Sequence, residues 1–132
     1  MRLLALVMIV SLALWAGPSL AASKSQQASE KAARDYLKLG LLHAEGGNDE
    51  EAAKAFQQAV SMKPGWAEAH SLLGSALARS GKYREAEEQL RKAVALKPDY
   101  GEGWYYLGLF LKDRGKTREA EQAFQKAKQL AR

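Results

Sequence analysis

A 34-residue internal period is the feature that most constrains how this chain can fold. Shifting the sequence by 34 residues places leucine, glycine and alanine at matching positions of three consecutive copies, and proline at matching positions of the first two. The matching sets are Leu39, Gly40, Ala52, Ala59 and Pro64, then Leu73, Gly74, Ala86, Ala93 and Pro98, then Leu107, Gly108, Ala120 and Ala127. Between the second and third copies 13 of 32 aligned residues are identical. A unit this short cannot bury its own apolar face, so its copies are expected to stack.

Each copy is expected to form two helices joined by a tight turn. The first helices are predicted over roughly 35–44, 68–79 and 102–112. Each is followed by a glycine, which lacks a Cβ and tolerates the left-handed conformation that ends a helix; these are Gly47, Gly81 and Gly115. The second helix has acidic residues early and basic residues late, an order that complements the helix dipole. Pro64 and Pro98 are then expected to end the second helix.

The smallest residues of each copy recur where the two helices are expected to approach closely. Gly40, Gly74 and Gly108 belong to the first helices, and the paired alanines belong to the second. Two sets of large apolar residues are expected to fill the space beside them: Leu39, Leu73 and Leu107, and Phe56, Leu90 and Phe124.

These residues resemble the tetratricopeptide repeat family, whose pattern is W-x2-L-G-x2-Y, then A-x3-F, A and P. The third copy matches it best, with Trp104, Leu107, Gly108, Leu111, Ala120, Phe124 and Ala127. The resemblance implies an all-α fold, a right-handed α-solenoid of three tandem helix-turn-helix repeats. Their expected boundaries are 33–66, 67–100 and 101–132.

The N-terminal residues are typical of a secretory signal peptide. Arg2 is the only ionisable side chain in 1–21, and the apolar stretch from Leu3 to Ala16 is 14 residues, short of the roughly 20 that span a bilayer as a helix. Cleavage is predicted after Ala21, which places small residues where signal peptidase requires them. The expected location is therefore the periplasm or outside the cell, with an uncleaved membrane anchor as the alternative. Residues 22–32 are expected to form a polar, flexible leader that merges into the first helix.

The sequence offers little for catalysis. It contains no cysteine, and its two histidines, His43 and His70, occupy positions where the repeat calls for a large core aromatic. The acidic cluster Glu85, Glu87 and Glu88 lies where a helix begins and is expected to complement the dipole. No hydrolase, metalloprotease or nucleotide-binding motif occurs. We expect no enzyme activity, no catalytic residue, no metal site and no cofactor.

Binding is better supported than catalysis. In the family that the chain resembles, the first helices of successive repeats line a concave groove. Carried over, the groove residues are Arg34, Leu37, Leu41, Glu68, Ser71, Ser75, Arg79, Glu102, Tyr105, Leu109 and Lys112, with Ala44, Glu45, Ala78 and Asp113 in the same register. Some members hold a chaperone C-terminal carboxylate with Lys and Asn at the positions of Leu37 and Leu41. This chain lacks that clamp and suits a segment with apolar anchors. The alternative is that Leu37, Leu41 and Leu109 pack within the array.

The predicted function is that of an exported interaction module, a scaffold or assembly factor with a protein or peptide partner. The net charge of +5 and the absence of interleaved aromatics argue against nucleic acid. The basic residues Lys112, Arg114, Lys116 and Arg118 leave peripheral contact with an anionic surface open. The third copy lacks the closing proline, and Lys128 replaces the valine of positions 60 and 94. Either this lysine suffices as a cap, or the C-terminal face meets a partner. A self-assembling subunit that stacks through this face, or an accessory subunit of an envelope enzyme or secretion complex, are the alternative functions.

Overall fold

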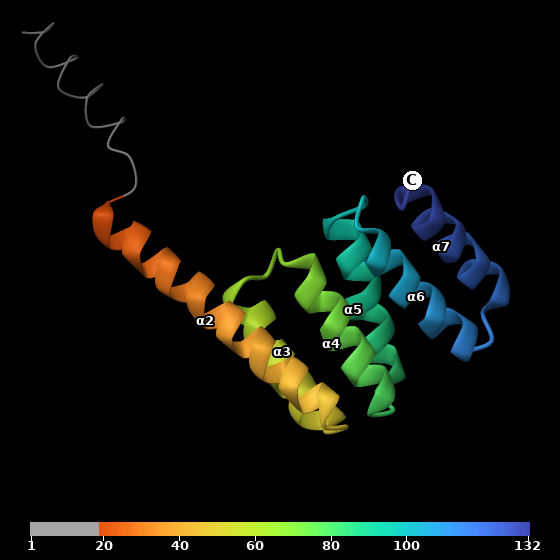
Figure 1. Cartoon of the computed structure of the whole chain (residues 1–132), viewed down its shortest axis with the longest axis horizontal. Helices are drawn as coiled ribbons and strands as arrows, with labels where there is room; N and C mark the ends of the chain where they lie inside the picture. The colour runs from red at the N-terminus through yellow and green to blue at the C-terminus, as the bar shows by residue number, and fades with distance from the viewer. Residues whose placement is uncertain (1–18) are drawn as a thin grey trace, which may run out of the picture.

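The computed structural model describes residues 19–132, which form six α-helices and no strand. The helices are α2 (Leu20–Glu45), α3 (Asp49–Met62), α4 (Ala67–Arg79), α5 (Tyr83–Leu96), α6 (Gly101–Asp113) and α7 (Thr117–Leu130). They form three helical hairpins, α2 with α3, α4 with α5 and α6 with α7, which stand side by side in chain order (Figure 1). The predicted all-α solenoid is confirmed.

Glycine ends the turn inside every hairpin, as predicted. Gly47, Gly81 and Gly115 have φ angles of 77°, 80° and 77°, a conformation that side chains with a Cβ disfavour. The residue after each glycine donates its backbone N–H to a carbonyl five residues earlier, over 2.8–2.9 Å. These bonds satisfy carbonyls that the end of the first helix would otherwise leave unpaired.

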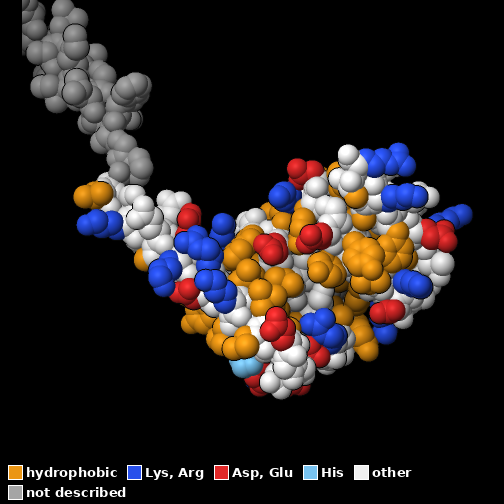
Figure 2. All heavy atoms as spheres, viewed as in Figure 1, with side chains coloured by type: hydrophobic (Ala, Val, Ile, Leu, Met, Phe, Trp, Pro, Cys, Tyr) orange, Lys and Arg blue, Asp and Glu red, His pale blue; other side chains and the backbone are white. Residues whose placement is uncertain are grey.

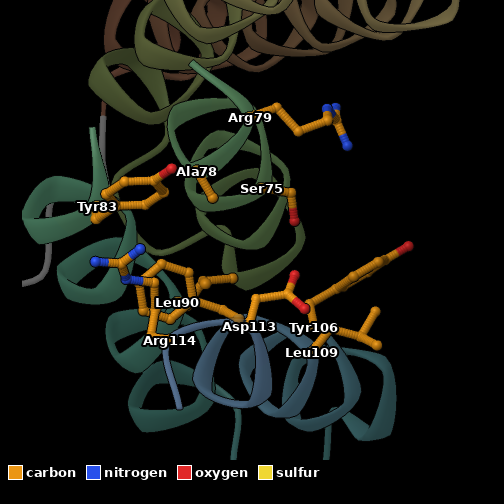
Figure 3. Close-up of a pocket in the computed structure, with 10 residues that line it drawn as sticks. Ser75, Ala78, Arg79, Tyr83, Leu90, Tyr106, Leu109, Asp113 and Arg114 are labelled. Atoms are coloured by element: carbon orange, nitrogen blue, oxygen red, sulfur yellow. The ribbon is translucent and has the colours of Figure 1, made fainter. Parts of the chain in front are cut away.

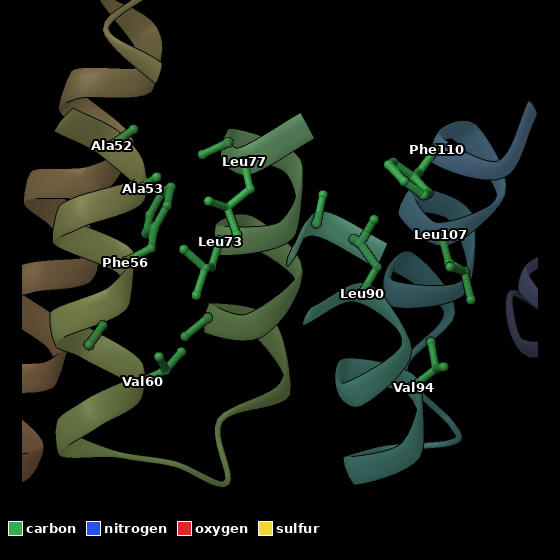
Figure 4. Close-up of a cluster of buried hydrophobic side chains, with 14 of the residues drawn as sticks. Ala52, Ala53, Phe56, Val60, Leu73, Leu77, Leu90, Val94, Leu107 and Phe110 are labelled. Atoms are coloured by element: carbon green, nitrogen blue, oxygen red, sulfur yellow. The ribbon is translucent and has the colours of Figure 1, made fainter. Parts of the chain in front are cut away.

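The small residues bring the helices of each hairpin together. A Cβ placed on Gly74 would lie 2.6 Å from Cγ of Leu90, and one on Gly40 would lie 2.5 Å from the ring of Phe56. Phe56, Leu73 and Leu90 are at most 1% exposed. Figure 4 shows Leu73 and Leu77 of α4 directed at α3, and Phe110 of α6 directed at α5. The core therefore runs through the stack and joins each hairpin to the next.

Leu39 departs from the prediction that the repeated leucines all fill the core. Its equivalents Leu73 and Leu107 are 1% and 2% exposed, whereas Leu39 is 43% exposed. The reason is its place in the stack: α3 covers Leu73, but no described helix precedes α2 to cover Leu39.

The predicted flexible leader is helical in the structure. Residues 22–32 belong to α2, which begins at Leu20. Ser19 caps this helix by accepting a hydrogen bond from the backbone N–H of Ala22 (3.3 Å), and Ser29 donates to the carbonyl of Met62 (3.2 Å). Alanine, glutamine, lysine and glutamate favour helix, so the segment continues the helix that the first repeat already requires.

Most of the predicted signal peptide lies outside the described residues. Only its last three residues, 19–21, are described, and the predicted cleavage point after Ala21 falls in the first turn of α2. None of the described helices combines the length and hydropathy that crossing a bilayer requires.

Candidate protein-binding groove

The helices α2, α4 and α6 together form one face of the molecule. These are the helices on which the sequence analysis predicted a groove. Figure 2 shows hydrophobic side chains gathered over this face, with charged side chains among and around them. Tyr105 is 50% exposed, Leu109 38% and Leu41 37%. The charged candidates Arg34, Glu68, Arg79, Glu102 and Lys112 are also exposed, and Ser75 is half-buried.

Leu37 and Ser71 are predicted groove residues that the structure buries. Leu37 is 8% exposed and belongs to the hydrophobic core, and Ser71 is fully buried on α4, which α6 contacts. Within residues 19–132 the Ser71 hydroxyl makes no hydrogen bond. These two side chains lie beneath the surface of the groove and are not part of its exposed surface.

A cavity of about 410 Å³ opens between α4, α5 and α6 (Figure 3). It brings together the predicted residues Ser75, Arg79 and Leu109. Its walls also contain residues that the sequence analysis did not assign to the groove: Tyr83, Leu90, Tyr106, Phe110 and Arg114. The guanidinium of Arg114 lies over the Tyr83 ring, 3.8 Å from its centre. Tyr83 lies two residues after the turn glycine Gly81, and Arg114 lies one residue before the turn glycine Gly115. The repeat pattern does not signal that either residue lies close to the groove helices.

Glu102 and Tyr105 line a second cavity, of about 490 Å³, next to α7. The hydroxyl of Tyr100 lies 3.5 Å from Oε2 of Glu102. Burial raises the pKa of Tyr100, and the negative charges of Glu102 and Glu68 raise it further, so the phenol stays neutral at physiological pH. The ring of Tyr105 contacts the ring of Phe124, with centres 5.7 Å apart. Of the predicted groove residues, Ser75, Arg79 and Leu109 line the first cavity and Glu102 and Tyr105 line the second, whereas the others line neither.

Ion pairs hold part of the charged rim in place. Arg79 Nε donates to Oδ1 of Asp49 over 2.7 Å, which links α4 to the preceding hairpin. Lys116 contacts Glu87 at 3.0 Å, so this basic residue is engaged within the molecule, as is Arg114 on Tyr83. Of the four basic residues that the sequence grouped as a surface for anions, two therefore have intramolecular contacts.

The two histidines and Glu87, which the sequence analysis considered for catalysis or metal binding, have structural surroundings. His70 is 3% exposed; its Nε2 donates to the carbonyl oxygen of Pro64 (2.7 Å), and its Nδ1 contacts the side-chain amide of Gln89 (2.7 Å). His43 is half-buried near the end of α2. Glu87 contacts Lys116 and Arg91. In residues 19–132 no three His, Cys, Asp or Glu side chains are grouped so that they would hold a metal ion.

Solved structures with a similar arrangement of helices include tetratricopeptide repeat domains. The second tetratricopeptide domain of Spaghetti (RPAP3), bound to the HSP90 peptide SRMEEVD, has a TM-score of 0.74 at 23% identity over 81% of this chain and 98% of that one. MamA has a TM-score of 0.69 at 27% identity, over 83% of this chain and 65% of that one. The Sgt2 tetratricopeptide domain from Aspergillus fumigatus has a TM-score of 0.72 at 23% identity, over 75% and 66%. No curated protein sequence matches the chain significantly.

Two family profiles, both described as tetratricopeptide repeat, match residues 33–65 and 71–132. Together they span most of the chain and all six described helices in part or in full. The chain therefore belongs to the tetratricopeptide repeat family.

Proposed function

We propose that this protein is an interaction module that binds a segment of a partner protein along the face of α2, α4 and α6. The observation that carries the proposal is the exposure of Leu41, Tyr105 and Leu109 on this one face, beside a cavity of about 410 Å³. Large apolar side chains left in water on one face are typical of binding sites. Charged groups such as Arg79 and Lys112 at the rim provide orientation and specificity.

The preferred ligand is a segment with apolar anchors. Spaghetti, one of the similar structures, is bound to the peptide SRMEEVD, which ends in acidic residues and valine. In this chain the two first-repeat positions that hold a carboxylate in some family members are Leu37, which is buried, and Leu41, which is exposed and apolar. We therefore propose an extended or helical segment whose apolar side chains contact Leu41 and Leu109 and enter the cavity between α4 and α6.

We further propose that the protein acts outside the cytoplasm, as a scaffold or assembly factor in a cell envelope. The composition of residues 1–21 supports export. Determining the N-terminus of the protein purified after expression of the complete coding sequence tests this. A first residue at or near Ala22 is expected, and an N-terminus at Met1 in a soluble protein would contradict it.

Selection from a displayed peptide library tests the binding site. The wild type should enrich peptides with regularly spaced apolar residues, and the double substitution Leu41→Glu and Leu109→Glu should weaken their binding at least 10-fold. Leu109→Ser, which introduces the residue of the equivalent position 75, should weaken binding while preserving the fold.

Leu96→Glu is the matched control, because Leu96 is 41% exposed but lies on α5. It should bind the selected peptides like the wild type. Circular dichroism and thermal unfolding check that every variant keeps its fold. Equal loss of binding in the control, or full binding by the folded groove variants, would overturn the proposed site.

A further inference from the structure

The two ends of the stack expose residues that are buried inside it. On α2, Leu39 and Leu42 are 43% and 65% exposed. The residues at the same repeat positions in α4 are Leu73 and Ala76, which are 1% and 0% exposed, and in α6 they are Leu107 and Phe110, which are 2% and 6% exposed. In the interior, a second helix from the preceding repeat covers these positions. The N-terminal end of the stack thus presents the surface that such a helix covers.

The C-terminal end presents the complementary surface. Tyr105 is 50% exposed, whereas its equivalents Leu37 and Ser71, each followed by a further repeat, are 8% and 0% exposed. In residues 19–132 no helix follows α7 to cover Tyr105 or the outer side of α7. The repeat geometry therefore leaves room there for the first helix of a further repeat, and α2 is such a helix.

Opposite charges would face each other if a second copy continued the stack with the geometry of the internal junctions. Inside the stack, a Cβ placed on Gly103 would lie 3.4 Å from Cγ1 of Val94, so these two positions face each other across the junction between α5 and α6. One repeat after Val94 is Lys128, and two repeats before Gly103 is Asp35. The two ends therefore replace an apolar contact with opposite charges. Lys31 contacts only Oδ2 of Asp35, which leaves Oδ1 for a second cation.

The three ion pairs between successive repeats also translate without repulsion. Each pair is shifted by whole repeats, so that one residue lies on α7 of one copy and the other in the first repeat of the next copy. The pair Glu87 with Lys116 then becomes Glu121 with Asn48. In the same way Arg91 with Glu119 becomes Gln125 with Glu51, and Arg79 with Asp49 becomes Glu45 with Thr117. Each translated pair joins a carboxylate to an amide or a hydroxyl, and none joins like charges. A junction built on the internal geometry is thus compatible at four polar positions, Lys128 with Asp35 included.

We propose that a second copy of this chain docks head to tail, with α2 of one copy on α6 and α7 of the other. Leu39 and Leu42 cover the α7 side of the junction, Asp35 pairs with Lys128, and α2 shields Tyr105. The contact is heterologous, because the two surfaces differ, so each added copy leaves both kinds of end available and the stack stays open. The observations that support this proposal do not depend on peptide binding at Leu41 and Leu109.

Sedimentation velocity over a concentration series tests the stack. The protein is expressed from its complete coding sequence and purified in the form that the cell makes. The wild type should grow in mass with concentration. Lys128→Asp alone, or Leu39→Glu with Leu42→Glu, should raise the concentration needed for association at least 10-fold. Lys92→Asp, which reverses an exposed charge on α5 of the middle hairpin, should associate like the wild type.

Mixing the two defective variants identifies the direction of the contact. Lys128→Asp retains an intact α2 surface, and the double leucine variant retains an intact α7 surface, so the mixture should form 1:1 pairs that grow no further. Circular dichroism checks the fold of each variant. A wild type that stays monomeric, single variants that still dimerise, or a mixture of folded variants that stays monomeric would overturn the proposal. Lys128→Asp leaves Leu41 and Leu109 unchanged and should bind the selected peptides like the wild type, so failure of the stack and failure of peptide binding are separable.

Discussion

Glycines in the first helices set the distance between the two helices of each hairpin. At Gly74 the nearest atoms to an added Cβ are Cγ of Leu90 at 2.6 Å and the backbone oxygen of Ala86 at 3.0 Å. A side chain can turn away from a new methyl group, but a backbone carbonyl in a helix cannot. Position 74 therefore requires glycine for a packing reason, although its backbone conformation suits any residue.

Gly74→Ala should lower the free energy of unfolding by about 1–3 kcal/mol, because the methyl group must push α5 away from α4. Urea unfolding followed by circular dichroism measures the change. Gly65→Ala is the control: no atom lies within 4 Å of a Cβ there, so the change should be close to zero or stabilising. Equal destabilisation by both would argue against close packing as the cause.

Glu87 links successive repeats through charge. Burial by itself would raise the pKa of Glu87, but hydrogen bonds from Lys116 and Arg91 outweigh it and lower the pKa below the ordinary value of 4.5. Arg91 also contacts Glu119 of α7 at 2.7 Å. One carboxylate thus organises contacts between α5 and the turn before α7.

Glu87→Gln should cost about 0.5–1 kcal/mol of stability at pH 7, since it removes the ion pairs with Lys116 and Arg91. Because the folded-state pKa of Glu87 is lowered, its contribution is fully present above pH 4.5 and is lost as the pH falls through the folded-state value. Urea unfolding of both proteins between pH 7 and pH 2.5 measures this. The difference between them should shrink on acidification, and a constant difference would exclude the charge as its source.

Among the elements, α2 differs from the other helices in length and in how it is held. It has 26 residues, whereas the others have 13 or 14, and its first buried residue is Ala33. The segment before Ala33 has the Ser19 cap and the Ser29 bond to Met62 as its tertiary and capping contacts. Most helical stability in proteins comes from packing, so this half of α2 depends chiefly on its own helix propensity.

Amide hydrogen exchange should therefore be faster in residues 22–31 than in residues 34–45 of the same helix, by at least 10-fold in protection. The extension opens locally, whereas the second half opens only when the hairpin with α3 separates. Exchange followed by mass spectrometry resolves the two segments. Equal protection along α2 would mean that a further contact holds the extension.

At the scale of the whole molecule, each hairpin is stabilised by its neighbours. The residue type at one repeat position differs between the internal junctions and the C-terminal end. Val60 and Val94 are 6% and 8% exposed at the two internal junctions, and the equivalent Lys128 is exposed on α7. Within one chain, apolar residues lie between neighbouring repeats, whereas Lys128 lies on a face that no described repeat of the same chain covers.

Val94→Lys should destabilise the protein by about 1–3 kcal/mol, because it brings a charge into the junction between α5 and α6. The helical signal of α6 and α7 should be lost first on heating. Lys128→Val tests the same exchange in reverse at an exposed position and should change the stability of the monomer by less than about 0.5 kcal/mol. Thermal unfolding at low protein concentration measures both. Similar effects of the two substitutions would contradict the distinction between junction and end.

Much of the fold follows from local sequence signals. The turn glycines, the paired alanines and the 34-residue period determine where the hairpins begin and end, because each acts within one repeat. How far α2 extends does not follow from the repeat, because its N-terminal half has no buried residue and therefore no apolar period. The burial of Leu37 and Ser71, and the contribution of Tyr83 and Arg114 to the cavity, depend on contacts between repeats that a single copy does not encode.

By itself, the sequence determined the all-helical repeat, the glycine turns and the residues that recur at each position. Only the tertiary structure decided which of those recurring residues are exposed: Leu73 and Leu39 share one repeat position, yet one is buried by α3 and the other meets solvent. The physical reason is that burial depends on the neighbouring repeat, which differs between the middle and the ends of a stack, whereas propensity and spacing are the same in every copy.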